Sequence, residues 1–166
     1  DKVFAVMALC PQHTFQVLTK RADRMKNYFI RDEEVPLISY WTEAVEPYVL
    51  GRFKSIPLEI MKNKTYANDE SAFLKNLWLG VSVENQKAAD ERIPLLLETP
   101  AAVRWLSCEP LLEKIDLSFI ENDGYKLNCL TGRQKDMGRP CEDAPSLIDW
   151  VVVGGESGNG SRPCDI

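Results

Sequence analysis

Four short apolar runs, each closed by polar or small residues, dominate the hydrophobic pattern of this chain. They lie at 15–19, 77–83, 103–107 and 148–153, and they end at Lys20-Arg21, Glu84-Asn85, Cys108-Glu109 and Gly154-Gly155-Glu156. The last run is rich in β-branched residues and predicts a strand buried on both faces. The intervals are long enough for helices, so the pattern indicates a repeated strand, loop and helix.

This repeat predicts an α/β fold with about four parallel strands and covering helices. Right-handed crossovers place the carboxyl ends of such strands on one side of the sheet. Parallel α/β proteins carry their chemistry at those ends. We therefore expect the functional residues to lie where the four runs stop.

Helical spacing of apolar residues appears at 1–10, 22–29 and 86–97. In the first segment the expected buried face consists of Val3, Val6, Met7 and Cys10, and Pro11 ends the helix. In the second it consists of Met25, Tyr28 and Phe29.

We expect residues 1–166 to form a single but incomplete domain, with a helical insertion at 31–76 and an irregular excursion at 113–147. The insertion is broken by prolines, and the excursion loses hydrophobic periodicity. The chain starts without Met, inside an amphipathic helix, and stops in a glycine-rich loop. These features predict an interior fragment of a longer protein.

Composition narrows the class of protein. With 20 basic and 25 acidic residues the formal charge is −5, which disfavours indiscriminate nucleic-acid binding but allows a local basic patch. No apolar run approaches the roughly 18 residues of a membrane helix, so no membrane partner is expected. Five scattered cysteines without a secretory signal indicate a reducing, cytoplasmic location.

Carboxylates recur at the predicted strand ends, as Glu84, Glu109 and Glu156. Converging carboxylates can bind a cation, hold an amino or hydroxyl group, or act as general acid and base. Alternatively, each pairs with Lys20, Arg21 or Arg104 in a structural ion network. The neighbouring polar and small residues complete the predicted site: Ser82, Asn85, Ser107, Gly154, Gly155 and Ser157.

A basic set, Lys20, Arg21, Arg24 and Lys26, begins the helix after the first strand. It is either a solvated helix start or an anion site at a helix N-terminus. Aromatic residues of the insertion, Trp41, Tyr48 and Phe53, are candidates for base stacking, although core packing is the better interpretation.

Cysteine chemistry is not favoured. The chain has one histidine, so Cys108 is interpreted as a buried structural thiol rather than a nucleophile. Cys129 and Cys141 would form half of a metal knuckle, but no second pair accompanies them. No metal ligands are therefore predicted.

Four strings together resemble a bacteriophage and prophage protein family of unknown function that is grouped with radical S-adenosylmethionine (radical SAM) proteins. They are FQVLTKR (15–21), LGVSVENQ (79–86) followed by ADERI (89–93), RWLSCEPLL (104–112) and DWVVVGGESG (149–158). The resemblance covers all four strand exits and is silent over 31–76 and 113–147.

The resemblance implies a partial (β/α) TIM-type barrel and, in the full-length protein, S-adenosylmethionine with a four-iron four-sulfur cluster. The cluster loop would lie before Asp1, so the fragment alone is expected to bind no cluster and to be inactive. The expected partners are the missing N- and C-terminal parts of the same barrel. Lys20, Glu84, Glu109 and Glu156 would be catalytic; Arg21, Ser82, Asn85, Ser107, Gly154, Gly155 and Ser157 would bind the cofactor.

The leading hypothesis is thus the middle portion of a radical SAM-like enzyme with an unknown substrate, for which a phage context favours a nucleic-acid or nucleotide component. The first alternative is a non-catalytic nucleic-acid-binding barrel that uses the basic set. The second is a hydrolase or lyase in which the three carboxylates hold a divalent cation.

Overall fold

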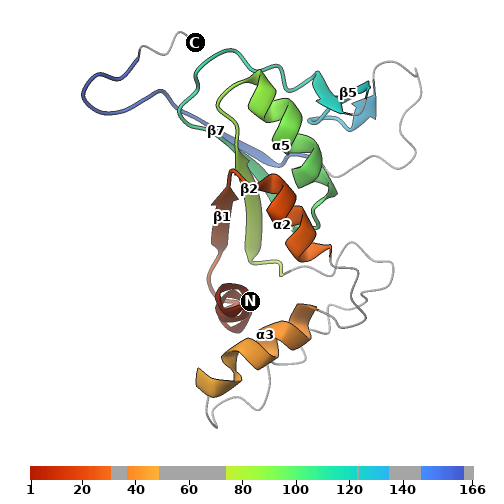
Figure 1. Cartoon of the computed structure of the whole chain (residues 1–166), viewed down its shortest axis with the longest axis vertical. Helices are drawn as coiled ribbons and strands as arrows, with labels where there is room; N and C mark the ends of the chain where they lie inside the picture. The colour runs from red at the N-terminus through yellow and green to blue at the C-terminus, as the bar shows by residue number, and fades with distance from the viewer. Residues whose placement is uncertain (31–36, 49–73, 123, 135–146, 163–166) are drawn as a thin grey trace.

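A four-stranded parallel sheet organises the protein (Figure 1). The computed structural model describes residues 1–30, 37–48, 74–122, 124–134 and 147–162. The strands are β1 (Phe15–Thr19), β2 (Leu77–Ser82), β3 (Val103–Cys108) and β7 (Trp150–Val153), and they follow one another in space as in the chain. Every neighbouring pair is parallel, so the predicted α/β fold with four parallel strands is confirmed.

Two helices cover one face of this sheet. α2 (Ala22–Phe29) and α5 (Gln86–Glu98) follow β1 and β2 and lie side by side (Figure 1). Because the chain steps from strand to strand in one direction, right-handed crossovers bring both helices to the same face. The core between helices and sheet is fully buried and is formed by Leu79, Val81, Ile93, Leu96 and Leu106.

The other face of the sheet carries a tryptophan cluster of Trp78, Trp105 and Trp150. The rings of Trp105 and Trp150 lie 5.6 Å apart, and those of Trp78 and Trp150 lie 5.9 Å apart in an edge-to-face arrangement. Gly80 pairs with Trp105 in the β2–β3 register, and its missing side chain leaves room for the indole. The alternation of strand side chains thus gives the sheet an aliphatic face and an aromatic face.

The sheet is open in the described ranges, with β1 and β7 at its edges, and no barrel closure is seen. The expectation that the last strand is buried on both faces is wrong, because Trp150 is 40% and Val153 52% exposed. An edge strand lacks a neighbour on one side, so an apolar sequence does not ensure its burial.

α1 (Lys2–Leu9) precedes the sheet, and α3 (Leu37–Val45) and the 3-10 helix η1 (Glu46–Tyr48) follow α2. The predicted buried face of α1 is wrong in part, since Val3 and Val6 are exposed and Ala5 and Ala8 are buried. The reason is Phe4, whose ring packs on aromatic rings of α2 and α3 and turns the helix toward them.

Within the insertion predicted at 31–76, the structure describes the helices α3 and η1 and a turn at 75–76 before β2; residues 31–36 and 49–73, with Phe53, lie outside the described ranges. Trp41 is buried, as the core interpretation predicts. Tyr48 is exposed, and its ring faces the Lys2 ammonium group. In the described ranges no helix has the length and apolar character needed to cross a membrane.

A second, small sheet forms where an irregular excursion was predicted. Its antiparallel strands are β4 (Ile120–Asn122), β5 (Tyr125–Asn128) and β6 (Arg133–Gln134). Ile120 and Leu127 are buried and pair across β4 and β5, and β4 packs on α5. Strands this short give little alternation to detect, which is why the sequence pattern missed them.

Candidate functional site

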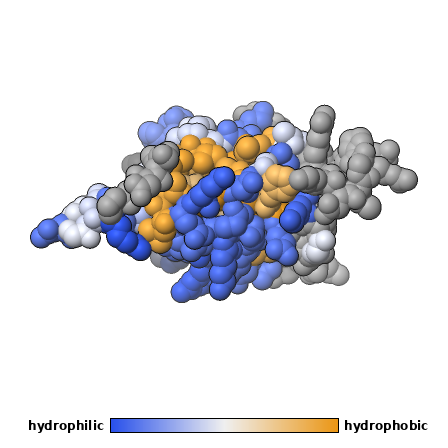
Figure 2. Space-filling view, turned by 90° about the horizontal axis from the view of Figure 1, so that it is seen from above, coloured by the Kyte–Doolittle hydropathy of each residue, from blue (hydrophilic) through white to orange (hydrophobic). Residues whose placement is uncertain are grey.

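Polarity increases along the aromatic face of the sheet toward the carboxyl ends of its strands. The tryptophan cluster gives way to Ser82 and Ser107, which pair in register and are 7% and 4% exposed. Lys20, Glu84 and Glu109 follow at the ends of β1, β2 and β3. In Figure 1 the β1 arrow points upward, toward its carboxyl end. Figure 2 views the molecule from above and shows a band of hydrophobic residues bordered by hydrophilic ones.

Glu84 is the centre of an ion-pair network at the end of β2. Arg92 Nη1 donates to Glu84 Oε2 at 2.9 Å and to the carbonyl of Ser82 at 2.7 Å. Lys20 Nζ donates to the other carboxylate oxygen, Glu84 Oε1, at 3.3 Å. The side chains of Arg92 and Glu84 are 16% and 20% exposed, whereas that of Lys20 is 60% exposed. The inner pair is therefore the stronger one, because solvent screens it less.

The network keeps Glu84 ionised. Burial acts to raise the pKa of Glu84, but the hydrogen bonds from Arg92 and Lys20 and their positive charges outweigh burial, so the pKa lies below its ordinary value. A carboxylate held in this way accepts hydrogen bonds but is a poor general acid near neutral pH. Its suitable role is to orient Lys20 and Arg92 or to accept from a ligand.

Glu109 contrasts with Glu84, because it is exposed and its carboxylate forms no hydrogen bond or ion pair with any described residue. It follows β3 and begins a cis peptide bond to Pro110. A Cβ atom added at Gly154 would lie 2.7 Å from Glu109 Oε1, so the glycine makes room for this carboxylate. Glu109 is thus the carboxylate of the edge that is available to a ligand.

The loop after β3 crosses the ends of the neighbouring strands. The amide of Leu111 donates to the carbonyl of Gly154 at 2.8 Å, and the amide of Leu112 donates to the carbonyl of Glu84 at 2.9 Å. The amide of Gly154 donates to the Cys108 carbonyl at 3.2 Å. That amide is therefore already used within the protein, and the loop is fixed to both β2 and β7.

Protein side chains also close the N-terminus of α5. Asn85 Oδ1 accepts from the amide of Ala88 at 2.8 Å, the usual contact of a helix N-cap. Glu113 Oε1 accepts from the amide of Gln86 at 3.0 Å. A carboxylate of the chain thus sits where a phosphate would bind a free helix start, and Asn85 has a structural contact at the predicted cofactor site.

Glu156 lies in the loop after β7, together with the exposed Gly155 and Ser157. Its Oε2 accepts from Arg162 Nε at 2.8 Å and from the Arg162 amide at 2.9 Å, and its Oε1 accepts from Arg162 Nη2. The side-chain and backbone hydrogen bonds and the charge of Arg162 lower the pKa of Glu156 to about 2. Glu84 and Glu156 are therefore each bound by a different arginine.

The Arg162→Ala substitution should raise the pKa of Glu156 from about 2 toward its ordinary range, since it removes the side-chain hydrogen bonds and the charge of Arg162 and leaves only the hydrogen bond from the amide of residue 162. Titration of the glutamate carboxyl carbons by NMR measures this change. Glu84, which depends on Arg92 and Lys20, serves as the internal control and should titrate as before. An unchanged Glu156 titration would contradict the pairing.

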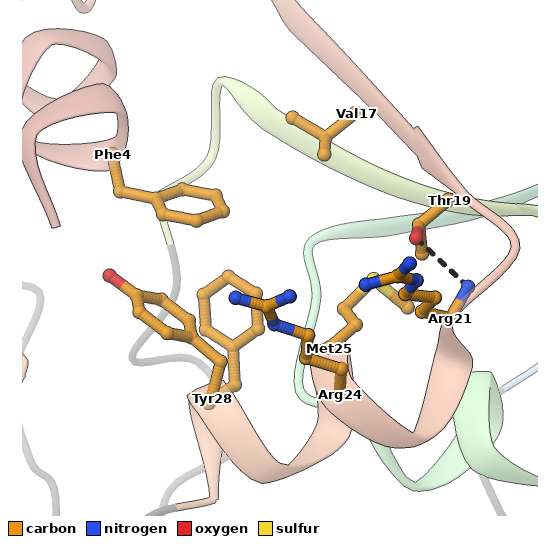
Figure 3. A pocket seen from close by; sticks show the side chains of 8 residues that line it. Phe4, Val17, Thr19, Arg21, Arg24, Met25 and Tyr28 are labelled. Carbon is orange, nitrogen blue, oxygen red and sulfur yellow. Dashed lines mark hydrogen bonds between the residues drawn. The ribbon is translucent and has the colours of Figure 1, made fainter.

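The basic set of α2 is divided by the structure. Lys20 pairs with Glu84, and Lys26 pairs with Glu98 on α5. Arg21 and Arg24 instead line a pocket between α1, β1 and α2 (Figure 3). Arg21 and its neighbour Lys20 therefore have different surroundings, because Arg21 lines this pocket and Lys20 pairs with Glu84.

Cysteines and metal ligands do not gather at the carboxyl edge in the described ranges. No group of three or more His, Cys, Asp or Glu residues there could hold a metal ion. Cys108 is a buried free thiol, as predicted, and burial together with the charge of Glu109 raises its pKa. Burial raises the pKa of Cys129 to about 11, and Cys141 lies outside the described ranges.

A family model covers this whole arrangement. The model of DUF5131, described as a protein of unknown function, matches residues 1–166. The chain belongs to DUF5131. No curated protein and no solved structure matches it. Membership of DUF5131 assigns no activity, so the relation to phage proteins and to radical SAM enzymes stays a prediction.

Sequence reasoning missed two residues of the DUF5131 edge, Arg92 and Glu113. Arg92 lies eight residues after Glu84 and two turns into α5, so it returns to the strand end that its helix left. A helix capped by Asn85 and followed by an arginine two turns later was a usable signal. No sequence signal pointed to Glu113, because its contact with the start of α5 depends on how the loop after β3 folds back.

Proposed function

We propose that this chain forms part of a radical SAM-like (β/α) barrel enzyme and that the carboxyl edge of its sheet binds the polar groups of S-adenosylmethionine. The observation that carries the proposal is the order of the sheet: four parallel strands follow the order of the chain, with their helices on one face. Doubly wound sheets reverse their strand order, whereas barrel strands continue in one direction.

The residues of the edge fit the cofactor's ammonium and ribose hydroxyl groups. Glu109 offers a carboxylate without a partner among the described residues, and Gly154 leaves space beside it. Lys20 lies at the end of β1, two strands away from Glu109. Its ammonium group would donate to the carboxylate of the cofactor in place of its present acceptor, Glu84. In enzymes of this class the cofactor supplies a radical once an iron–sulfur cluster reduces it.

The described residues do not fit the cluster itself. They contain no group of three cysteines that could hold iron, and their two buried thiols have raised pKa values. A thiolate is the form that binds metal, so these thiols are poor ligands. The cluster residues implied by the resemblance would therefore lie outside the residues that the structure describes.

Glu109→Gln tests this function. We expect the chain to bind S-adenosylmethionine in isothermal titration calorimetry and the substitution to weaken binding about tenfold or more, because a charge-assisted hydrogen bond to the ammonium group is lost. Glu91→Gln, a change on the exposed side of α5, is the matched control and should bind as the unchanged chain does. Absence of binding, or equal loss in both variants, would refute the proposal.

A further inference from the structure

A pocket of about 370 Å³ lies between α1, β1 and α2, on the face of β1 that is turned toward the helices. Its walls are mainly apolar and include Phe4, Val17, Met25 and Phe29. Figure 3 shows the Phe4 ring and Val17 on one side and the side chains of α2 on the other. Pockets of roughly 300 to 1,000 Å³ are the size that small organic ligands occupy.

Two guanidinium groups reach into this apolar space. Arg21 and Arg24, one turn apart at the start of α2, both extend toward the gap beneath Val17 (Figure 3). Neither guanidinium forms a hydrogen bond or ion pair with any residue that the structure describes, whereas the neighbouring Lys20 and Lys26 both do. The charge of this pocket is therefore uncompensated within the described protein, although the whole chain carries −5.

A third polar group, the Thr19 hydroxyl, lies beside Arg21. Thr19 Oγ1 accepts a hydrogen bond from the Arg21 amide at 3.0 Å, which fixes the hydroxyl at the pocket wall and leaves its proton free to donate (Figure 3). Thr19 and Arg21 thus lie together at one end of the cavity, and the Arg24 side chain extends from α2 toward Tyr28 (Figure 3). This distribution matches a ligand with an anionic head and a flat apolar body.

We infer that this pocket binds a nucleoside monophosphate, with the phosphate between Arg21 and Arg24 and the base against the apolar wall. A phosphate monoester carries about −1.5 to −2 charges at pH 7, which two guanidinium groups neutralise. A single carboxylate, as in a fatty acid, would leave one of them uncompensated. Aromatic walls such as Phe4 and Phe29 favour a base, because stacking on rings stabilises any of the four bases.

This site is separate from the proposed S-adenosylmethionine site. The pocket uses the helix-facing side of β1 and the start of α2, while Glu109 and Gly154 lie at the ends of β3 and β7. Glu109→Gln should therefore leave nucleotide binding unchanged. The two proposals can consequently fail independently of each other.

Isothermal titration calorimetry of the whole chain with AMP, GMP, CMP and UMP tests the inference. We expect at least one nucleotide to bind, and Arg21→Ala and Arg24→Ala each to weaken that binding about tenfold or more, since each removes a charge-assisted contact. Both arginines are exposed, so neither change should unfold the chain. Lys114→Ala removes an exposed cation outside the pocket and should have no effect.

Inorganic phosphate, adenosine, decanoate and phosphotyrosine serve as probes of the ligand class. Phosphate alone and adenosine alone should each bind more weakly than AMP, because each fills one part of the pocket. Nucleotide binding that is absent, or that survives both arginine substitutions, would overturn the inference. Tighter binding of inorganic phosphate, decanoate or phosphotyrosine than of every nucleotide would overturn it as well.

Discussion

Gly80→Ala should lower the free energy of unfolding by about 2 to 3 kcal/mol, the cost of overpacking a close-packed interior. An added Cβ at this position would lie 2.5 Å from Trp105 Cε2 and 2.6 Å from Trp105 Nε1. Trp105 is only 7% exposed and its rigid ring packs on Trp150, so the indole would have to shift against its neighbours. Chemical denaturation followed by circular dichroism measures the loss.

Gly154→Ala is the matched control for this substitution. The atom that its Cβ would meet is Glu109 Oε1, the end of a flexible and exposed side chain that can turn away. We therefore expect a cost of about 0.5 kcal/mol or less, the usual range for surface changes. Equal costs at Gly80 and Gly154 would contradict the view that the tryptophan cluster is a tightly packed layer.

The expected cost at Gly80 can be traced to its partner by a double substitution. Trp105→Leu removes the ring that the new Cβ would meet, so adding Gly80→Ala to that variant should cost much less than adding it to the original chain. A cycle with no coupling would show that the glycine is needed for another reason. The Trp105→Leu variant of this cycle also measures how much the buried indole contributes to stability, since its Nε1 has no hydrogen-bond partner among the described residues.

Much of the sheet was predictable from the sequence, since buried parallel strands appear as short apolar runs between helices. The run at 15–19 corresponds to β1, and those at 77–83 and 103–107 differ from β2 and β3 by one residue at their ends. The pattern could not reveal burial at the edge, as Val153 shows, or the aromatic contacts that turn α1. Both depend on which elements meet, and periodicity within one segment carries no such information.

The candidate site was predicted as a set of residue types at strand ends, but its pairings were not. Lys20 and Glu84 were expected at one edge and lie 3.3 Å apart. The alternative of a structural ion network holds for Glu84, whose second partner is Arg92 rather than Arg21 or Arg104. Arg104 donates instead to the carbonyl of Thr99. Side-chain partners depend on loop and helix geometry, which the sequence pattern does not determine.

Arg92→Met should lower the free energy of unfolding by about 2 kcal/mol, because it leaves the Ser82 carbonyl and one oxygen of Glu84 without their donor. This expected loss is smaller than the cost of breaking a fully buried ion pair, since Glu84 is 20% exposed and keeps its ion pair with Lys20. The buried Arg92 Nε also has no partner among the described residues, so its removal recovers part of the loss. Lys20→Met is the control and should cost about 0.5 kcal/mol, as exposed pairs do.

The same substitution should change how stability depends on pH. The pKa of Glu84 is lower in the folded protein than its ordinary value, so the unfolded chain binds its proton first as the pH falls. The contribution of the network is therefore complete above about pH 5 and is lost as the pH falls through the folded pKa of Glu84. Arg92→Met should reduce this acid loss when unfolding is measured from pH 7 to pH 3. An equal reduction of the acid loss by Lys20→Met would show that the pair of Arg92 and Glu84 is not the one that holds the end of β2 to α5.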